Sequence, residues 1–245
     1  MRAVILAAGV GQRLSPFTLS MPKCLLPVGG RSLLERMLES LAGVGPDEVL
    51  LVVGHCQEQI RDRIGSRFGR LPVRYVRNPD YGKGSIRSLW SCREELSGDL
   101  LVMDADVLFP SEFLRRLMAA PSPSAFLLDR NFADTGEEMK LFVRGDRVVA
   151  IGKTVPPEAY DQVGEGVGFF KCGAAHAEPL RECVEETVTR EPEETEYEAA
   201  LDRLLRRVKV GYADISGLAW TEIDFPEDLR RAREEVLPNI GHVAA

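Results

Sequence analysis

Residues 1–23 read MRAVILAAGVGQRLSPFTLSMPK, and the expected architecture of the whole chain starts from them. Residues 1–6 form a short apolar run with β-branched side chains, which predicts a buried strand. The next residues, AAGVG at 7–11, form a loop of small side chains. Its two glycines let backbone N–H groups approach a phosphate closely. The stretch therefore predicts a strand that leads into an anion-binding loop.

Strands and helices alternate along the first 110 residues. Apolar runs predict the strands, and apolar residues at helical spacing predict the helices between them. The expected strands are 48–53, 73–76 and 99–103, and the expected helices are 32–42, 57–64 and 85–96. Ser32 and Glu35 predict a capping box at the first helix. This alternation predicts a doubly wound, mostly parallel sheet, whose ligands bind at the carboxyl ends of the strands.

The second half of the chain is richer in strands and turns. Expected strands are 125–128, 139–143, 147–151, 165–171, 208–215 and 219–223, and expected helices are 177–190, 196–207 and one that begins at Pro226. A Gly145–Asp146 turn predicts a hairpin. No internal repeat or low-complexity linker divides the chain. We therefore expect a single Rossmann-like α/β domain over residues 1–245, with a mixed, mainly parallel sheet flanked by helices.

The composition argues against several classes of protein. Lysine and arginine number 31 and aspartate and glutamate 38, so the net charge is −7 and a general nucleic-acid binder is not expected. The apolar run from Ala3 to Ala8 is too short for membrane insertion, which takes about 20 residues. The five cysteines are scattered without a CxxC pair, so we expect reduced thiols in a cytoplasmic protein. Three widely separated histidines suggest neither a zinc site nor a catalytic triad.

Two cations, Arg13 and Lys23, lie on the long loop after the first strand. Such a pair can neutralise a triphosphate and the charge that develops at a phosphorus under attack. The loop differs from other phosphate-binding loops. A dinucleotide fingerprint needs a third glycine where Leu14 stands, so a nicotinamide-dependent dehydrogenase is not expected, and no GxxxxGK[ST] loop occurs. Glycines and cations of this kind also occur in plain surface turns.

The longer pattern resembles the signature of the nucleotidylyltransferases that activate phosphorylated sugars and alcohols. That signature reads L-A-A-G-x-G-x-R-L-x-P-x-T, then P-K, then L-L-P-V-x-G, and residues 6–29 match it nearly throughout. The resemblance implies that Arg13 and Lys23 bind phosphates and stabilise the transition state. It implies a nucleotide-binding half at 1–110 and an acceptor-binding half at 111–245. The residues expected to hold the nucleotide through their backbone are Leu6, Ala7, Ala8, Gly9 and Gly11.

Gly84 and Ser85 open a predicted helix within NPDYGKGSIRSLW at 78–90. A glycine and a serine at this place offer N–H groups and a hydroxyl, and they also make an ordinary helix cap. The resemblance implies that Gly84 and Ser85 contact the nucleotide base. Trp90 is expected in the core rather than against a base.

Two carboxylates, Asp104 and Asp106, follow a predicted buried strand. Buried carboxylates are costly unless they meet cations or donors, and hard oxygen ligands suit Mg²⁺. The resemblance assigns Asp106 to the metal and Asp104 to the ribose or a metal-bound water. It adds Asp224, from WTEIDFPED at 220–228, as a second metal ligand, although an acidic residue before a helix also serves as a cap. Asp106 and Asp224 are therefore expected to meet in space.

The residues expected to bind the acceptor lie in the second half of the chain. The resemblance implies a pocket that includes Lys153, Glu165, Tyr197, Glu198 and Trp220. Lys153 suits a phosphate, and Glu165 suits a hydroxyl or an ammonium. An aromatic wall of Tyr197 and Trp220, with Phe169 behind them, would suit a quaternary ammonium. An aminoalkylphosphonate would favour Glu165 or Glu198 instead. All these residue types are also common as ordinary surface or core side chains.

The stretches MDADVLF, EEMK, YEAA and WTEIDFPEDL most resemble the cytidylyltransferases that act on phosphocholine, aminoalkylphosphonates or inositol phosphate. We therefore expect a Mg²⁺-dependent enzyme that joins CMP from CTP to a phospho- or phosphono-alcohol and releases pyrophosphate. A hexose-1-phosphate nucleotidylyltransferase that uses UTP or dTTP, and a non-catalytic nucleotide-sensing relative, stay as alternatives. The expected partners are small-molecule substrates. The sequence leaves open the acceptor and the oligomeric state, a homodimer included.

Overall fold

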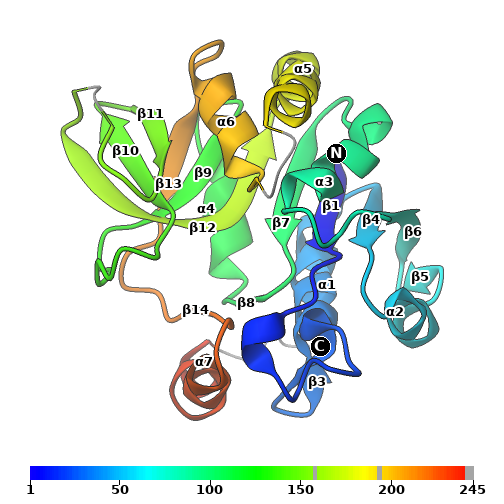
Figure 1. The fold of residues 1–245 in the computed structure, drawn as a ribbon. Coiled ribbons are helices and arrows are strands. Elements are labelled where there is room, and N and C mark those ends of the chain that lie inside the picture. Colours follow the sequence, from blue (N-terminus) through cyan, green and yellow to red (C-terminus); the bar gives the residue numbers. More distant parts are fainter. Residues whose placement is uncertain (157–158, 192–194, 241–245) are drawn as a thin grey trace.

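The computed structural model describes residues 1–156, 159–191 and 195–240. One mixed sheet runs through both halves of the chain (Figure 1). Its main path has the strand order β11-β10-β12-β7-β1-β4-β6-β5, and β9 and β13 join it beside β12. Because strands from both halves hydrogen-bond within one sheet, the two halves form one continuous architecture.

The central strands of the first half are parallel. β1 (Arg2–Ala7) lies between β4 (Glu48–Val53) and β7 (Leu100–Asp104), and β6 (Leu71–Arg77) follows beyond β4. The short β5 (Arg67–Phe68) pairs with β6 in the antiparallel direction at the edge. Since β1 and β7 run side by side in the same direction, the loop after β1 lies beside the loop after β7.

Antiparallel pairs predominate in the second half. The long strand β12 (Gln162–Cys172) pairs with β7, with β9 (Ala125–Asp129) and with β10 (Lys140–Arg144), and β11 (Arg147–Gly152) forms the edge. β13 (Gly211–Asp214) adds a parallel pair with β9. The expected single α/β domain with a mixed sheet is confirmed, and its parallel pairing is concentrated in the first half.

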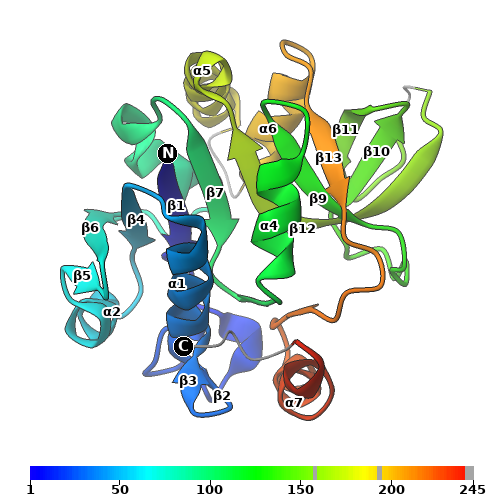
Figure 2. The same ribbon diagram turned by 180° about the vertical axis from the view of Figure 1, so that it is seen from behind.

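Two helical layers cover the sheet (Figures 1 and 2). One layer is α1 (Leu33–Val44), α2 (Gln57–Ile64) and α4 (Glu112–Ala119), and the other is α3 (Ile86–Ser91), α5 (Ala174–Arg190) and α6 (Glu198–Leu205). Side chains of β1 alternate between the two cores: Ala3 and Ile5 face the first, and Val4 faces the second. The sheet is buried on both faces, which explains the continuous apolar runs of its strands.

A third apolar cluster ties the two ends of the chain together. β14 (Thr221–Glu222) pairs with β8 (Val107–Leu108), and α7 (Pro226–Arg231) follows it. The backbone N–H of Ile223 also donates to the carbonyl of Asp106 at 3.1 Å. The cluster consists of Leu14, Leu26, Val28, Leu33, Leu108, Ile223, Leu229, Ala232 and Val236. It holds the segment before α7 against the N-terminal loop.

Most predicted elements are present, but several ends differ. The helix expected over 85–96 stops at Ser91, whose hydroxyl donates to the carbonyl of Arg87 at 2.7 Å, and a 3₁₀ turn (Arg93–Glu95) follows. The hairpin at Gly145–Asp146 is confirmed between β10 and β11. The sequence analysis missed α4, the strand β8 and the small hairpin of β2 (Pro27–Val28) and β3 (Arg31–Ser32).

All five cysteines are free. Among the described residues, no helix combines the length and the apolar character that crossing a membrane requires. Burial raises the pKa of the Cys24 thiol to about 12, so this side chain stays protonated at neutral pH. Cys24 is therefore a packing residue rather than a nucleophile, although it borders one of the cavities described below.

The predicted capping box of α1 is confirmed, and it offers a test of the fold. Ser32 Oγ accepts from Glu35 N at 3.2 Å, and Glu35 Oε2 accepts from Ser32 N at 2.8 Å. We expect Ser32→Ala to lower the free energy of unfolding by about 1 kcal/mol, measured by urea denaturation. Ser111→Ala is the matched control, because Ser111 precedes α4 without a side-chain cap hydrogen bond. Equal losses in both variants would contradict the role of the cap.

Candidate active site

Two cavities open at the carboxyl ends of β1 and β7. The smaller, about 500 Å³, is bordered by the loop after β1 and the start of α3. The larger, about 1100 Å³, is bordered mainly by the second half of the chain. The residues that line both cavities are Arg13, Gly84, Ser85, Asp104, Asp106 and Asp224. The two cavities therefore meet along a boundary of charged and small polar residues.

The smaller cavity brings together every residue that the sequence analysis assigned to the nucleotide. They are Leu6, Ala7, Ala8, Gly9, Gly11, Gly84, Ser85 and Asp104. The loop folds tightly here. Gly11 has φ +66°, and a Cβ at this position would come within 3.2 Å of Lys23 and Thr18. Thr18 Oγ1 donates to the Gly11 carbonyl at 2.6 Å. The loop backbone is thus fixed around the cavity. Tyr81, which the sequence analysis did not assign, also lines it.

Lys23 joins two carboxylates that lie far apart in the sequence. Its Nζ donates to Asp106 Oδ2 at 2.8 Å and to Asp224 Oδ1, and Arg13 donates to Asp224 Oδ2 at 3.3 Å. The Lys23 side chain is only 12% exposed. Burial by itself would lower its pKa, but the charges of Asp106 and Asp224 outweigh burial and raise the pKa above its ordinary value. The ammonium group therefore stays charged. The expected meeting of Asp106 and Asp224 is present in the structure.

Three carboxylates at or beside this boundary fit a divalent cation. Asp106, Glu222 and Asp224 each offer one oxygen, and these oxygens lie within 4.8 Å of one another. Asp106 Oδ1 is buried and has no hydrogen-bond partner among the described residues. An unpartnered buried carboxylate oxygen is costly, and a hard cation such as Mg²⁺ would satisfy it.

Glu222 was missed by the sequence analysis. It lies two residues before Asp224, and side chains two apart in an extended segment point to the same side, so this spacing is the signal that could have found it. Its side chain is open to the cavity. The surrounding protein removes part of the water around the Glu222 carboxyl. This desolvation, together with the negative charges of Asp106 and Asp224, raises the pKa of Glu222 to about 8.

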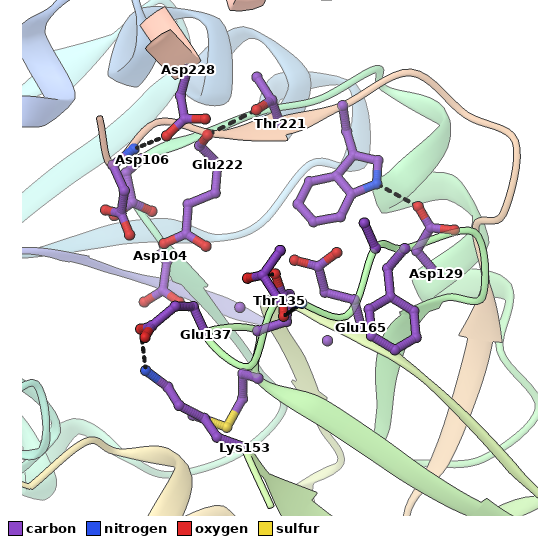
Figure 3. Close-up of a pocket in the computed structure, with 18 of the residues that line it drawn as sticks. Asp104, Asp106, Asp129, Thr135, Glu137, Lys153, Glu165, Thr221, Glu222 and Asp228 are labelled. Atoms are coloured by element: carbon purple, nitrogen blue, oxygen red, sulfur yellow. Dashed lines mark hydrogen bonds and ion pairs between the residues drawn. The ribbon is translucent and has the colours of Figure 1, made fainter. Parts of the chain in front are cut away.

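The larger cavity contains all five residues expected at the acceptor: Lys153, Glu165, Tyr197, Glu198 and Trp220. In Figure 3, Asp104, Asp106 and Glu222 lie on one side of this cavity, and Asp129 and Glu165 lie on the other. Lys153 makes ion pairs with Glu137 at 3.6 Å and Glu196 at 3.9 Å. The ammonium group expected to hold a phosphate thus already lies between carboxylates.

The expected aromatic wall is not formed. Tyr197 is 3% exposed and Phe169 is 1% exposed, so both belong to the core. The Tyr197 hydroxyl donates instead to Asp104 Oδ2 at 2.8 Å. Trp220 borders the cavity, and its Nε1 donates to Asp129 Oδ2 at 2.7 Å. Residue type in the sequence could not show that Tyr197 turns its ring toward the core, because long-range packing decides this.

The larger cavity is strongly acidic. Its cationic side chains are Arg13, Lys153 and Arg231, and its carboxylates are Asp104, Asp106, Asp129, Glu137, Glu138, Glu165, Glu196, Glu198, Glu222, Asp224 and Asp228. Within the described part of the chain, the Glu165 carboxyl has neither a hydrogen-bond nor an ion-pair partner, although its backbone pairs within the sheet. Burial, then the charges of Glu138 and Asp129, raise its pKa to about 7, against the opposing charge of Arg231.

Residues 3–150 match the model of the MobA-like NTP transferase domain. The chain belongs to this family. The expected nucleotidylyltransferase family is therefore confirmed, and the loop from Leu6 to Gly11 lies within the matched residues.

The proteins similar to this NTP transferase include two that share more than 30% identity with it. It is 36% identical to a CMP-5'-(3-aminopropyl)phosphonate synthase of Streptomyces rubellomurinus, over 94% of this chain and 38% of the relative. It is 34% identical to a bifunctional IPC transferase and DIPP synthase of Rubrobacter xylanophilus, over 96% of this chain and 52% of the relative. The chain thus spans about half the length of these relatives, or less. The solved CTP:phosphocholine cytidylyltransferase of Streptococcus pneumoniae matches with a TM-score of 0.75 and 25% identity, over 95% of this chain and 97% of that one.

The carboxylate cluster predicts a metal-binding phenotype. We expect Asp106→Asn to weaken Mn²⁺ binding at least about tenfold, because a charged ligand becomes a neutral one. Electron paramagnetic resonance of free Mn²⁺ measures the affinity. Asp146→Asn is the matched control, because Asp146 is exposed and pairs with Lys209 at 2.6 Å, outside both cavities. Unchanged Mn²⁺ affinity in Asp106→Asn would refute the assignment.

Glu165 predicts a pH-dependent stability. Its pKa is raised from 4.5 to about 7 in the folded state, so the folded chain favours the protonated form and loses stability as the pH rises through this range. Glu165→Gln removes that loss. At pH 8 the free energy of unfolding of this variant should exceed that of the parent by about 1 kcal/mol, a value that allows for solvent screening of the partly buried Glu165 carboxylate. At pH 4 the difference should be small. Glu58→Gln, at an exposed carboxylate of α2, should show no such pH-dependent difference. A gain from Glu165→Gln that is equal at both pH values would contradict the prediction.

Proposed function

We propose that the chain is a Mg²⁺-dependent cytidylyltransferase that joins CMP from CTP to a phospho- or phosphono-alcohol and releases pyrophosphate. The shared boundary of the two cavities carries this proposal. Arg13, Asp106 and Asp224 line both cavities, and Lys23 is hydrogen-bonded to both aspartates. A nucleotide in the smaller cavity and an acceptor in the larger one would therefore meet at these charges.

The proposed chemistry needs positioning and charge neutralisation. An anionic oxygen of the acceptor attacks the α-phosphorus of CTP, and a new P–O bond forms there as the bond to the β-phosphate breaks. Pyrophosphate leaves with the electron pair. Because the attacking oxygen is already ionised, no strong general base is required. Lys23, which stays protonated, and Arg13 offer N–H donors to the phosphate oxygens as negative charge develops on them.

Asp106, Glu222 and Asp224 are the residues that would hold the metal. Bound Mg²⁺ would supply further neutralisation of the triphosphate charge. Asp228 supports this arrangement, because its Oδ2 accepts from Asp224 N at 3.1 Å and from Phe225 N at 2.8 Å. These two hydrogen bonds orient the backbone that carries the Asp224 carboxylate. Asp228 is therefore a positioning residue for Asp224.

The acceptor that we propose carries a positive charge at the end away from its phosphorus. The excess of carboxylates in the larger cavity supports this choice, as does Glu165, whose side chain is available for an ammonium. Two of the similar proteins are named for compounds that contain such a group, one for its product CMP-5'-(3-aminopropyl)phosphonate and one for its substrate phosphocholine. Those two names also support the choice of CTP among the nucleotides. An inositol phosphate has no cationic group, so the acidic lining would offer it fewer favourable electrostatic contacts.

Pyrophosphate release tests the proposal directly. The assay contains Mg²⁺, one of the four NTPs or dTTP, and phosphocholine, 2-aminoethylphosphonate, inositol phosphate or glucose 1-phosphate. We expect release with CTP and an amine-bearing acceptor. Release only with UTP or dTTP and glucose 1-phosphate would instead establish the hexose-1-phosphate enzyme. CTP binding by calorimetry without turnover on any acceptor would favour the nucleotide-sensing relative.

The role of Lys23 predicts a large loss of turnover. We expect Lys23→Ala to lower the rate of pyrophosphate release at least about 100-fold, as is typical when a key electrostatic group is removed. The rate is measured at saturating substrates. Lys209→Ala is the matched control, since Lys209 is exposed and lies outside both cavities. Near-normal turnover in Lys23→Ala would exclude the proposed role.

A further inference from the structure

A short segment at the start of α6 lies between the two cavities. Residues 195–198 all line the larger cavity. Glu196 pairs with Lys153 across it at 3.9 Å, and Lys153 in turn pairs with Glu137 at 3.6 Å. The segment is thus part of the wall that an acceptor would touch. Its other contacts reach the smaller cavity.

The backbone of this segment rests on the start of α3. Tyr197 N donates to Ser85 Oγ at 2.9 Å, and Ile86 N donates to the Thr195 carbonyl at 3.2 Å. Gly84 has φ +87°, and a Cβ there would lie 2.3 Å from the Thr195 oxygen. Only glycine allows so close an approach. The two residues expected at the nucleotide base, Gly84 and Ser85, are therefore packed directly against the acceptor wall.

The side chain of Tyr197 reaches a second residue of the smaller cavity. Its ring is buried in the core, and its hydroxyl donates to Asp104 Oδ2 at 2.8 Å. On β12, Gly168 has φ +65°, and a Cβ at this position would lie 2.1 Å from the same carboxylate oxygen. The Asp104 carboxylate is therefore held between the Tyr197 hydroxyl and the backbone of Gly168. Asp104 lines both cavities.

We infer that Tyr197 is a positioning residue that couples acceptor binding to nucleotide binding. One residue hydrogen-bonds to Ser85 through its backbone and to Asp104 through its side chain, while its neighbours Glu196 and Glu198 line the acceptor cavity. An acceptor that contacts Glu196 or Glu198 therefore acts on the residue that holds two contacts of the nucleotide cavity. A preference of the acceptor for one position of this residue changes the affinity for CTP, and the effect is reciprocal. This inference rests on the proposed assignment of the two cavities.

The coupling is measured by calorimetry without turnover. The nucleotide probe is α,β-methylene-CTP, which cannot release pyrophosphate, titrated in Mg²⁺ with and without saturating 2-aminoethylphosphonate; phosphocholine is the second acceptor probe. We expect one of these acceptors to tighten nucleotide binding at least about fivefold in the parent chain. In Tyr197→Phe, which keeps the ring but loses the hydroxyl, the factor should fall below about twofold.

Tyr75→Phe is the matched control, because its hydroxyl donates to the Gly65 carbonyl at 2.6 Å, outside both cavities. It should keep the full coupling factor. Thermal unfolding of both variants checks that they fold. A parent chain without coupling for either acceptor, or a Tyr197→Phe chain with undiminished coupling, would overturn the inference. Failure of the proposed function is separate: it appears as absent pyrophosphate release from the parent chain with CTP, whatever the coupling factor.

Discussion

The structure depends on one buried cation. Lys23 sits between Asp106 and Asp224, and its ammonium neutralises two carboxylates that would otherwise repel each other. Those carboxylates come from the middle and from the C-terminal part of the chain, so this one charge joins the loop after β1, the loop after β7 and the segment before α7. A buried lysine would ordinarily lose its proton more easily, but its two partners reverse that tendency. A permanent positive charge is thereby fixed where the two cavities meet.

The fold supplies the framework for this contact. Parallel pairing of β1 with β7 aligns the ends of both strands, which brings Lys23 and Asp106 to the same edge of the sheet. Pairing of β14 with β8 then delivers Glu222 and Asp224 to that edge, and the third apolar cluster holds the returning segment in place. Antiparallel strands of the second half build the acidic wall opposite. The loops proposed to bind the nucleotide therefore lie beside the wall proposed to bind the acceptor, because strands from both halves belong to one sheet.

Local patterns were sufficient for much of this account. The main strands and the capping box of α1 follow from short motifs, and the meeting of Asp106 with Asp224 was expected from the resemblance to the nucleotidylyltransferases. Contacts made by long-range packing could not be predicted from the sequence. Tyr197 lies in an unremarkable helix start, and only the tertiary structure turns its ring inward and its hydroxyl toward Asp104. The hydrogen bond between Trp220 and Asp129 likewise depends on how β9 and β14 approach each other.

A crystal structure of the chain with α,β-methylene-CTP and Mn²⁺ tests the central claim most directly. Anomalous scattering locates the manganese without reference to the protein atoms. The account predicts a manganese peak among the carboxylates of Asp106, Glu222 and Asp224, with the triphosphate against the backbone of residues 7–11 and the cytosine toward Gly84 and Ser85. A manganese peak away from these carboxylates, or a nucleotide bound in the larger cavity, would contradict it.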